Sequence, residues 1–243
     1  HGVTHISGTP SQWRRVMVAP SVKTFAPTYI RLSGEIADQS VLDRIHSLFP
    51  ATSIAHAFAS TEAGVAFEVT DGLAGFPASL VDRAREPVSI AVRDGALLIK
   101  SDRSAVGYLG ANAPCLHGTD GFVNTGDLVD LRGGRYYFVG RRDGVINIGG
   151  LKVHPEEVEA VINQHPSVRI CQVKGRSNAI TGGIVTANVV IDLDNVENKI
   201  ERAEVVRDEI MSLCRRSLAR HKIPALLRFV NSLEYSSSGK VGR

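Results

Sequence analysis

The sequence predicts an α/β layer, then a β-rich region, and finally a small α+β domain. Three observations support this fold class: an amphipathic helix followed by an apolar strand near the start, a run of hairpins in the middle, and a βαββαβ order of elements after residue 140. The 243 residues are 43% hydrophobic and 22% charged, which suffices for one large or two small cores. We expect two domains, residues 1–140 and 141–243, joined by a tight hinge because the boundary is not rich in Pro or Ser.

The α/β layer is predicted from the first part of the chain. In ADQSVLDRIHSLFP the apolar side chains fall on one helical face, and Pro50 ends the helix. The following TSIAHAFA is typical of a short buried strand. A further helix is expected around Trp13, just after SGTPS.

The middle of the chain is predicted to be mostly β. The runs VSIAV and ALLIK flank a turn at Asp94-Gly95, and DLVDL and YYFVG flank a turn at Gly133-Gly134. Apolar runs around Gly-containing turns indicate β-hairpins.

The last part of the chain predicts the small α+β domain. The segment GVINIGGLKV has the pattern of a hairpin, and HPEEVEAVINQHP that of a helix that starts at Pro155 and ends before Pro166. VRICQVKG and GIVTANVVI follow as strands, and LLRFV as a final strand. Between them we expect a helix whose buried face carries Val206, Ile210, Leu213 and Ser217/Leu218.

Composition excludes several classes of function. The net charge of +3 comes from scattered Lys and Arg that are not interleaved with aromatic residues, so a nucleic-acid groove is not expected. The three cysteines lack CxxC spacing, which argues against a disulfide framework or a thiolate zinc site. No run is long and apolar enough for a membrane span, and the first residues do not resemble a signal peptide. We expect a soluble, cytoplasmic protein.

Two polar stretches in the first domain interrupt the apolar elements. In FASTEAG, Phe58 offers a flat face for a base, Thr61 a hydroxyl, and Glu62 a carboxylate suited to a hard cation such as Mg²⁺. In NTGDL, the two oxygens of Asp127 can accept both hydroxyls of a ribose. Taken singly, FASTEAG is better explained as a cap and loop, and the Asp of NTGDL as a turn residue.

Two further stretches lie beyond the expected domain boundary or border it. GRRDGVINIGGLKV combines Arg141, able to bind a phosphate or ribose, with Gly149 and Gly150, which allow a ligand to approach the backbone. A plain hairpin would explain the glycines as well. SSSGKVGR places a single cation, Lys240, on a Gly- and Ser-rich segment that could otherwise be a solvated tail.

Together, in this order and spacing, the four stretches resemble the core motifs of the adenylate-forming superfamily of acyl-CoA synthetases, luciferases and peptide-synthetase adenylation domains. RLSGE and GALLIKSDRSAVGYLG are also similar to family motifs, so the resemblance covers essentially the whole chain. It implies the C-terminal part of a large acyl- and ATP-binding domain, with an α/β layer and a β-barrel-like subdomain, followed by a small α+β lid that rotates between two half-reactions.

The resemblance also implies roles for individual residues. Lys240 would be the mobile catalytic lysine, which stabilises charge at the α-phosphate only when the lid is closed. Asp143 would be the hinge. In the first domain, Phe58 would stack on adenine, Thr61 would contact the α-phosphate and Glu62 would hold Mg²⁺. Asp127 and Arg141 would bind the ribose, and Asn147 would lie near the nucleotide. The pantetheine tunnel would be bordered by Gly149, Gly150 and Lys152.

The chain departs from the family pattern in three places. An Ala occupies position 59 of the motif that normally begins aromatic-Gly, and Glu234 replaces a Pro before the terminal segment. The third departure is the missing Lys-containing, Gly-rich loop that cradles the β- and γ-phosphates of ATP, for which SGTPS lacks the Lys and the glycines. We therefore expect the C-terminal half to two-thirds of a longer enzyme, inactive by itself.

The function that the resemblance implies is an ATP-dependent acid–CoA ligase of the kind found in fatty acid metabolism. It would use a carboxylic acid, ATP with Mg²⁺, and CoA, and would form an acyl-adenylate and then a thioester. An enzyme that loads an acyl or aminoacyl group on a carrier protein is the nearest alternative, and a non-catalytic nucleotide- or acyl-binding module is a rival of another class. The sequence does not identify the acid: His5, Trp13 and His56 could line its pocket but are better explained as packed core residues.

Overall fold

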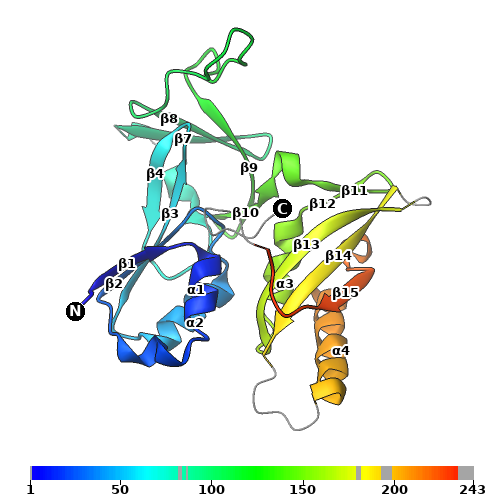
Figure 1. Ribbon diagram of the computed structural model, residues 1–243. Coiled ribbons are helices and arrows are strands. Elements are labelled where there is room, and N and C mark those ends of the chain that lie inside the picture. Colours follow the sequence, from blue (N-terminus) through cyan, green and yellow to red (C-terminus); the bar gives the residue numbers. More distant parts are fainter. Residues whose placement is uncertain (1, 82–83, 86, 179–181, 193–198, 235–243) are drawn as a thin grey trace. The chain divides into compact units, whose positions relative to one another are not determined.

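The chain folds into two compact units (Figure 1). The computed structural model describes residues 2–81, 84, 85, 87–178, 182–192 and 199–234. The first unit comprises residues 1–13 and 20–143, and the second comprises residues 14–19 and 144–243. That the second unit acts as a mobile lid stays a prediction.

The first unit begins with the expected α/β layer, a four-stranded sheet in the order β1-β2-β3-β4. Its first three strands, β1 (His5–Gly8), β2 (Tyr29–Ser33) and β3 (Ser53–Ser60), are parallel, and β4 (Gly64–Val69) is antiparallel to β3. Two helices lie between the parallel strands, α1 (Pro10–Val16) after β1 and α2 (Gln39–Leu48) after β2. The helices predicted around Trp13 and before Pro50 and the strand predicted at TSIAHAFA are confirmed.

Local sequence explains where α2 begins and which face it buries. Asp38 caps the helix, because its carboxylate accepts a 3.0 Å hydrogen bond from the Val41 amide. Val41 and Ile45 are fully buried beneath it. Trp13 is 2% exposed and its ring meets that of Phe49 edge to face, which confirms the explanation of Trp13 as a core residue. His5 is exposed, so the same explanation is wrong for His5.

The second part of the first unit is a six-stranded antiparallel sheet in the order β5-β10-β9-β8-β7-β6. Both predicted hairpins are confirmed, because β7 pairs with β8 and β9 with β10. The Asp94-Gly95 turn has φ of 49° and 74°, the left-handed pair that a two-residue hairpin needs. The strands are β5 (Phe76–Pro77), β6 (Ala84–Arg85), β7 (Val88–Arg93), β8 (Ala96–Ser101), β9 (Val123–Arg132) and β10 (Arg135–Arg141).

One core joins the two sheets of the first unit. It is formed by buried side chains from the β3–β4 turn and from β4, β5, β7, β8 and β9, and the aromatic rings within it lie against one another. Its buried members are Ala63, Phe67, Val69, Phe76, Ile90, Leu97, Ile99 and Val129.

A buried arginine ties the strand β10 to the segment between β4 and β5. Arg135 is 9% exposed, and its guanidinium donates five hydrogen bonds, two to the Asp71 carboxylate and one each to the carbonyl oxygens of residues 73, 74 and 75. Burial by itself would raise the pKa of Asp71, but the hydrogen bonds from Arg135 and the Leu73 amide, together with the Arg135 charge, outweigh it and hold the pKa below its usual value. His56 holds the same segment from β3, with Nε2 2.9 Å from the Leu73 carbonyl oxygen, and burial lowers the pKa of His56.

The second unit contains the expected small α+β domain. Its sheet has the order β13-β14-β15, with β13 (Val168–Asn178) antiparallel and β15 (Leu226–Phe229) parallel to β14 (Gly182–Ile191). The helices α3 (Pro155–Ile162) and α4 (Lys199–Ser217) pack on one face of it. The predicted α4 stripe is confirmed at Val206, Ile210 and Leu218, but Cys214 is fully buried in it while Leu213 is only partly buried.

A short hairpin precedes α3, as GVINIGGLKV predicts. It consists of β11 (Ile146–Ile148) and β12 (Leu151–Val153), joined by Gly149 and Gly150 at φ of 55° and 86°. The hairpin packs closely on β14, because a Cβ at Gly183 would lie 2.8 Å from the Asn147 carbonyl oxygen. Glycine is therefore required at that point of contact.

No helix in the described part of the chain is long and apolar enough to cross a bilayer.

The Arg135 contact predicts a large loss of stability when it is removed. Arg135→Ala removes two hydrogen bonds from a carboxylate and one from each of three carbonyl oxygens, so we expect the free energy of unfolding of the first unit to fall by about 3 kcal/mol or more. Arg132→Ala is the matched control on the same hairpin. Its side chain is 59% exposed and pairs with the exposed Asp130, so the loss should stay below about 1 kcal/mol.

The measurement is urea unfolding followed by the fluorescence of Trp13, the single tryptophan, which is buried in the first unit. Equal losses in the two variants would show that the Arg135 hydrogen bonds do not hold the sheets together.

Candidate functional site

The turn between β3 and β4 carries Thr61 and Glu62. Ser60 shapes this turn, because its Oγ accepts a 3.0 Å hydrogen bond from the Ala63 amide. Thr61 is exposed, and Glu62 is half-buried. Both side chains are thus accessible to a ligand at the end of the first sheet.

Asp127 lies on β9, directly across from Arg141 at the end of β10. Its amide donates to the Thr125 hydroxyl at 3.1 Å, and that hydroxyl donates to the Leu97 carbonyl oxygen at 3.0 Å, which anchors the strand at this point. Burial raises the pKa of Asp127, and the charges of Asp143 and Glu62 raise it further, against the opposing effects of Thr125 and Arg141. Glu62 and Asp127 are therefore close enough to interact electrostatically.

Arg141 lies between two carboxylates. Its Nε donates to Asp143 Oδ1 at 3.1 Å, and its Nη1 is 3.9 Å from Asp127 Oδ1. The hydrogen bond with Asp143 is the main reason why the pKa of Arg141 is raised. The Arg141 side chain is 53% exposed, so these ion pairs are weak and the guanidinium is available to an anionic or hydroxylated ligand. A side chain at Gly126 would approach Arg141 Nη2 to 3.3 Å, so the glycine leaves room for it.

Phe58 lies nearer the core than the predicted role requires. Its ring is nearly parallel to those of Phe67 and Phe138, with centroids 5.6 and 5.4 Å away. Phe58 remains half-buried, so a base could stack only on the part of the ring that these neighbours leave exposed.

The remaining predicted residues lie in the second unit or outside the described chain. Asn147 and Lys152 are exposed cross-strand partners on the β11–β12 hairpin, whose turn is Gly149-Gly150. Adding a Cβ to either glycine meets no atom within 4 Å, so the turn is open to its surroundings. Lys240 is outside the described residues.

Three residues that support the site were not predicted from sequence. Thr125 anchors Asp127, as described above. Tyr108 directs its hydroxyl at Glu62 Oε1, at 3.5 Å, and the nearby Ala105 amide donates to the Glu62 carbonyl oxygen at 2.8 Å. His117 Nε2 lies 2.7 Å from the Ala105 carbonyl oxygen and so holds this loop against the turn. Tyr108 belongs to the SAVGYLG motif, whereas no local signal distinguishes His117.

The chemistry of the first-unit cluster suits a nucleotide. Two carboxylates, a hydroxyl and a guanidinium come from the turn after β3, the middle of β9 and the end of β10, and they provide acceptors for ribose hydroxyls and a donor for a phosphate or ribose oxygen. No group of three or more His, Cys, Asp or Glu side chains within the described ranges could hold a metal ion. A hard cation at Glu62 would therefore complete its shell with water and ligand oxygens.

The chain is similar to several known proteins. The family described as "AMP-binding enzyme C-terminal domain" matches residues 157–240. The 2-succinylbenzoate–CoA ligase of Enterococcus faecalis is 30% identical over 150 residues, which are 61% of this chain and 29% of that protein. The isonitrile lipopeptide synthase of Streptomyces coeruleorubidus is 31% identical over 163 residues, which are 63% of this chain and 10% of that protein.

A solved structure shows the same fold. The benzoate CoA ligase of Burkholderia xenovorans superposes with a TM-score of 0.79 at 24% sequence identity, over 99% of this chain and 50% of that one. Residues 157–240 thus match the AMP-binding enzyme C-terminal domain, and the chain is homologous to acid–CoA ligases. It spans about half the length of the solved relative and a smaller share of the curated ones.

The electrostatics of the site predict opposite responses of Asp127 to its two neighbours. Arg141→Ala removes a charge that lowers the pKa of Asp127, so the pKa should rise further. Asp143→Asn removes a charge that raises it, so the pKa should fall.

Carboxyl-carbon NMR titration of the labelled chain measures both changes, with the Asp127 signal assigned by its loss in Asp127→Asn. Arg142→Ala, an exposed neighbour, is the control and should leave the titration unchanged. A fall in the Asp127 pKa on loss of Arg141 would contradict the arrangement described.

Proposed function

We propose that this chain supplies the adenylate site and the lid of an AMP-forming acid–thiol ligase of the acyl-CoA synthetase type. The observation that carries the proposal is the meeting of Glu62, Asp127 and Arg141 at one site, from three elements far apart in the sequence. The homology to acid–CoA ligases supports it independently.

Each side chain of the first unit has a role that its chemistry allows. Asp127 accepts hydrogen bonds from the two ribose hydroxyls, and Arg141 donates to the same ribose from the adjacent strand. Thr61 contacts the α-phosphate from the exposed turn. Glu62 holds Mg²⁺, which offsets the phosphate charge when it is bound. Phe58 presents its exposed part to the adenine.

The second unit supplies the residues that act in each half-reaction. In the first, an oxygen of the acid carboxylate bonds to the α-phosphorus and pyrophosphate leaves. Lys240 neutralises the negative charge that develops on the α-phosphate. In the second, a thiolate bonds to the acyl carbon and AMP leaves. Gly149, Gly150 and Lys152 border the passage of the pantetheine arm, Asn147 lies beside the nucleotide, and Asp143 is the hinge.

The thiol acceptor has two candidates. CoA is favoured by the similarity to a CoA ligase, and a carrier protein by the similarity to a lipopeptide synthase. Both acceptors present the same pantetheine arm, so the hairpin suits either. A non-catalytic module is less well supported, because such a module has no physical need to keep Glu62, Asp127 and Arg141 together.

Nucleotide binding by the chain itself tests the proposed adenylate site. We expect calorimetric titration to detect AMP binding, and Asp127→Ala to weaken it at least ~10-fold through the loss of charge-assisted hydrogen bonds. Asp130→Ala, an exposed position on the same strand, is the matched control and should bind normally.

A second ligand makes this test specific to the ribose. 2′,3′-Dideoxy-AMP lacks both hydroxyls, so it should bind the wild-type chain more weakly than AMP does. The difference between the two ligands should be smaller in Asp127→Ala, where only the Arg141 contact to the ribose remains. The proposal fails if the wild-type chain does not bind AMP, or if the hydroxyls matter equally in the two proteins.

The proposed role of Lys240 predicts a separation of the two half-reactions. In a full-length ligase assembled with this chain, Lys240→Ala should lower pyrophosphate exchange by ~10²–10³-fold or more, the loss expected for one preorganised donor. Thioester formation from supplied acyl-AMP and CoA should be nearly unchanged, and Lys222→Ala is the control lysine in the same unit. Equal losses in both steps would contradict an adenylation-specific role.

A further inference from the structure

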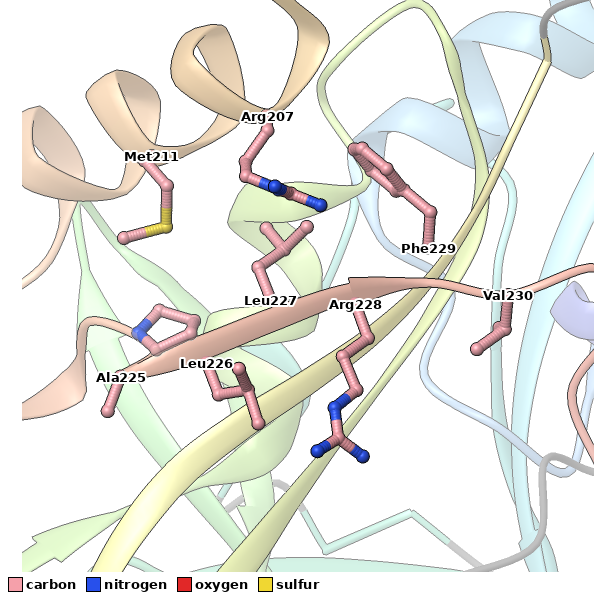
Figure 2. Close-up of a pocket in the computed structure, with 9 residues that line it drawn as sticks. Arg207, Met211, Ala225, Leu226, Leu227, Arg228, Phe229 and Val230 are labelled. Atoms are coloured by element: carbon pink, nitrogen blue, oxygen red, sulfur yellow. The ribbon is translucent and has the colours of Figure 1, made fainter. Parts of the chain in front are cut away.

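The second unit carries an open groove of about 610 Å³ that the proposed function does not use (Figure 2). Arg207 and Met211 line it from α4, and residues 224–230 line it from β15 and the turns beside it. Leu227 and Phe229 point toward α4, whereas Leu226 and Arg228 point to the other side of the strand. The groove therefore follows β15 and has two different faces.

The groove coincides with the free edge of a sheet. Within the described residues β15 pairs only with β14, on one side. The Ala225 amide donates to the Val185 carbonyl oxygen in that ladder. In a parallel ladder successive residues alternate direction, so Leu226 and Arg228 present their backbone N–H and C=O groups to the outer edge. An unpaired edge of this kind is a template for a further strand.

The groove is also positively charged. No Asp or Glu is among its lining residues, and in the described part of the chain neither Arg207 nor Arg228 has an ion-pair partner. Arg207 instead lies over the Phe229 ring, 5.3 Å from its centroid. Arg228 is exposed beside the strand. A carboxylate on an added strand would pair with Arg228 across the ladder.

The charge and the free backbone groups of the groove indicate which kind of polypeptide could bind there. A second copy would place Arg207 and Arg228 of one chain near those of the other, which like-charge repulsion disfavours. The sequence after Glu234, YSSSGKVGR, contains only basic charges, so it does not complement the groove either. An extended acidic segment with apolar residues at alternate positions matches the free backbone groups, the apolar face toward α4, and the cation on the opposite face.

We propose that β15 is the docking edge for an extended, acidic segment of a partner protein, which adds a fourth strand to the sheet of the second unit. The apolar side chains of that segment pack on Met211, Leu227 and Phe229, and its carboxylates pair with Arg228. Backbone hydrogen bonds supply affinity, and the alternation of side chains supplies specificity.

Fluorescence anisotropy with defined peptides tests the proposal on the 243-residue chain. The probe is a labelled peptide of sequence Thr-Val-Glu-Ile-Glu-Val-Thr, in which apolar and acidic residues alternate. We expect binding that is at least ~10-fold weaker for Arg228→Glu. Arg216→Glu, the same change at an exposed position of α4 outside the groove, is the control and should bind normally.

Two altered peptides separate strand addition from simple charge attraction. A shuffled peptide with its two Glu residues adjacent has the same charge but the wrong alternation, and it should bind at least ~10-fold more weakly. N-methylation at alternate backbone amides should abolish binding when it modifies the set that faces β15 and should have little effect on the other set.

Three results would overturn the proposal. If the shuffled peptide binds as tightly as the original, the interaction is charge attraction and not strand addition. If Arg228→Glu and Arg216→Glu lose the same affinity, the binding site lies elsewhere. Sedimentation that shows a dimer dissociated by the peptide would assign the edge to a second copy instead. Circular dichroism of each variant confirms that the fold is retained.

Discussion

The hydrogen bonds of Arg135 are the constraint on which the first unit depends. This side chain comes from the six-stranded sheet, and it holds the segment that leads out of the four-stranded sheet, where His56 contacts the same carbonyl group at Leu73. Because the loss of acceptors from a buried guanidinium is strongly destabilising, these hydrogen bonds hold the segment against β10. The core between the sheets then sets the turn that carries Glu62 against the strand that carries Asp127.

In this site, burial and the charge of Arg141 have opposite effects on the pKa of Asp127. Asp127 is sufficiently buried that its pKa rises, yet Arg141 and Thr125 favour its ionised form. Arg141 in turn shares its guanidinium between Asp127 and Asp143, so a ligand that draws Arg141 toward Asp127 weakens its hold on Asp143. Asp143 is also the last residue of the first unit.

In the second unit, the two functions that we propose lie on different surfaces. Its helices cover one side of the sheet with an apolar core, and the β11–β12 hairpin is held on the strands through the close approach at Gly183. The edge of β15 remains unpaired within the described residues and carries cations without carboxylate partners. The hairpin that we assign to the reaction and the edge that we assign to a partner are therefore different surfaces of one small domain.

The sequence by itself determined the fold class, both hairpins of the six-stranded sheet, the helix before Pro50, the β11–β12 hairpin and most of the α4 stripe, because these follow from local periodicity, caps and turns. It also predicted Glu62, Asp127 and Arg141 as site residues, because their motifs are local, and these roles stay predictions. Only the tertiary structure showed that Thr125 anchors Asp127, that His117 and Tyr108 hold the turn at Glu62, that Arg135 joins two sheets, and that Phe58 packs on Phe67 and Phe138. These contacts join residues that lie apart in the chain and have no shared sequence period, so their partners are decided by packing and by the need to satisfy buried polar groups.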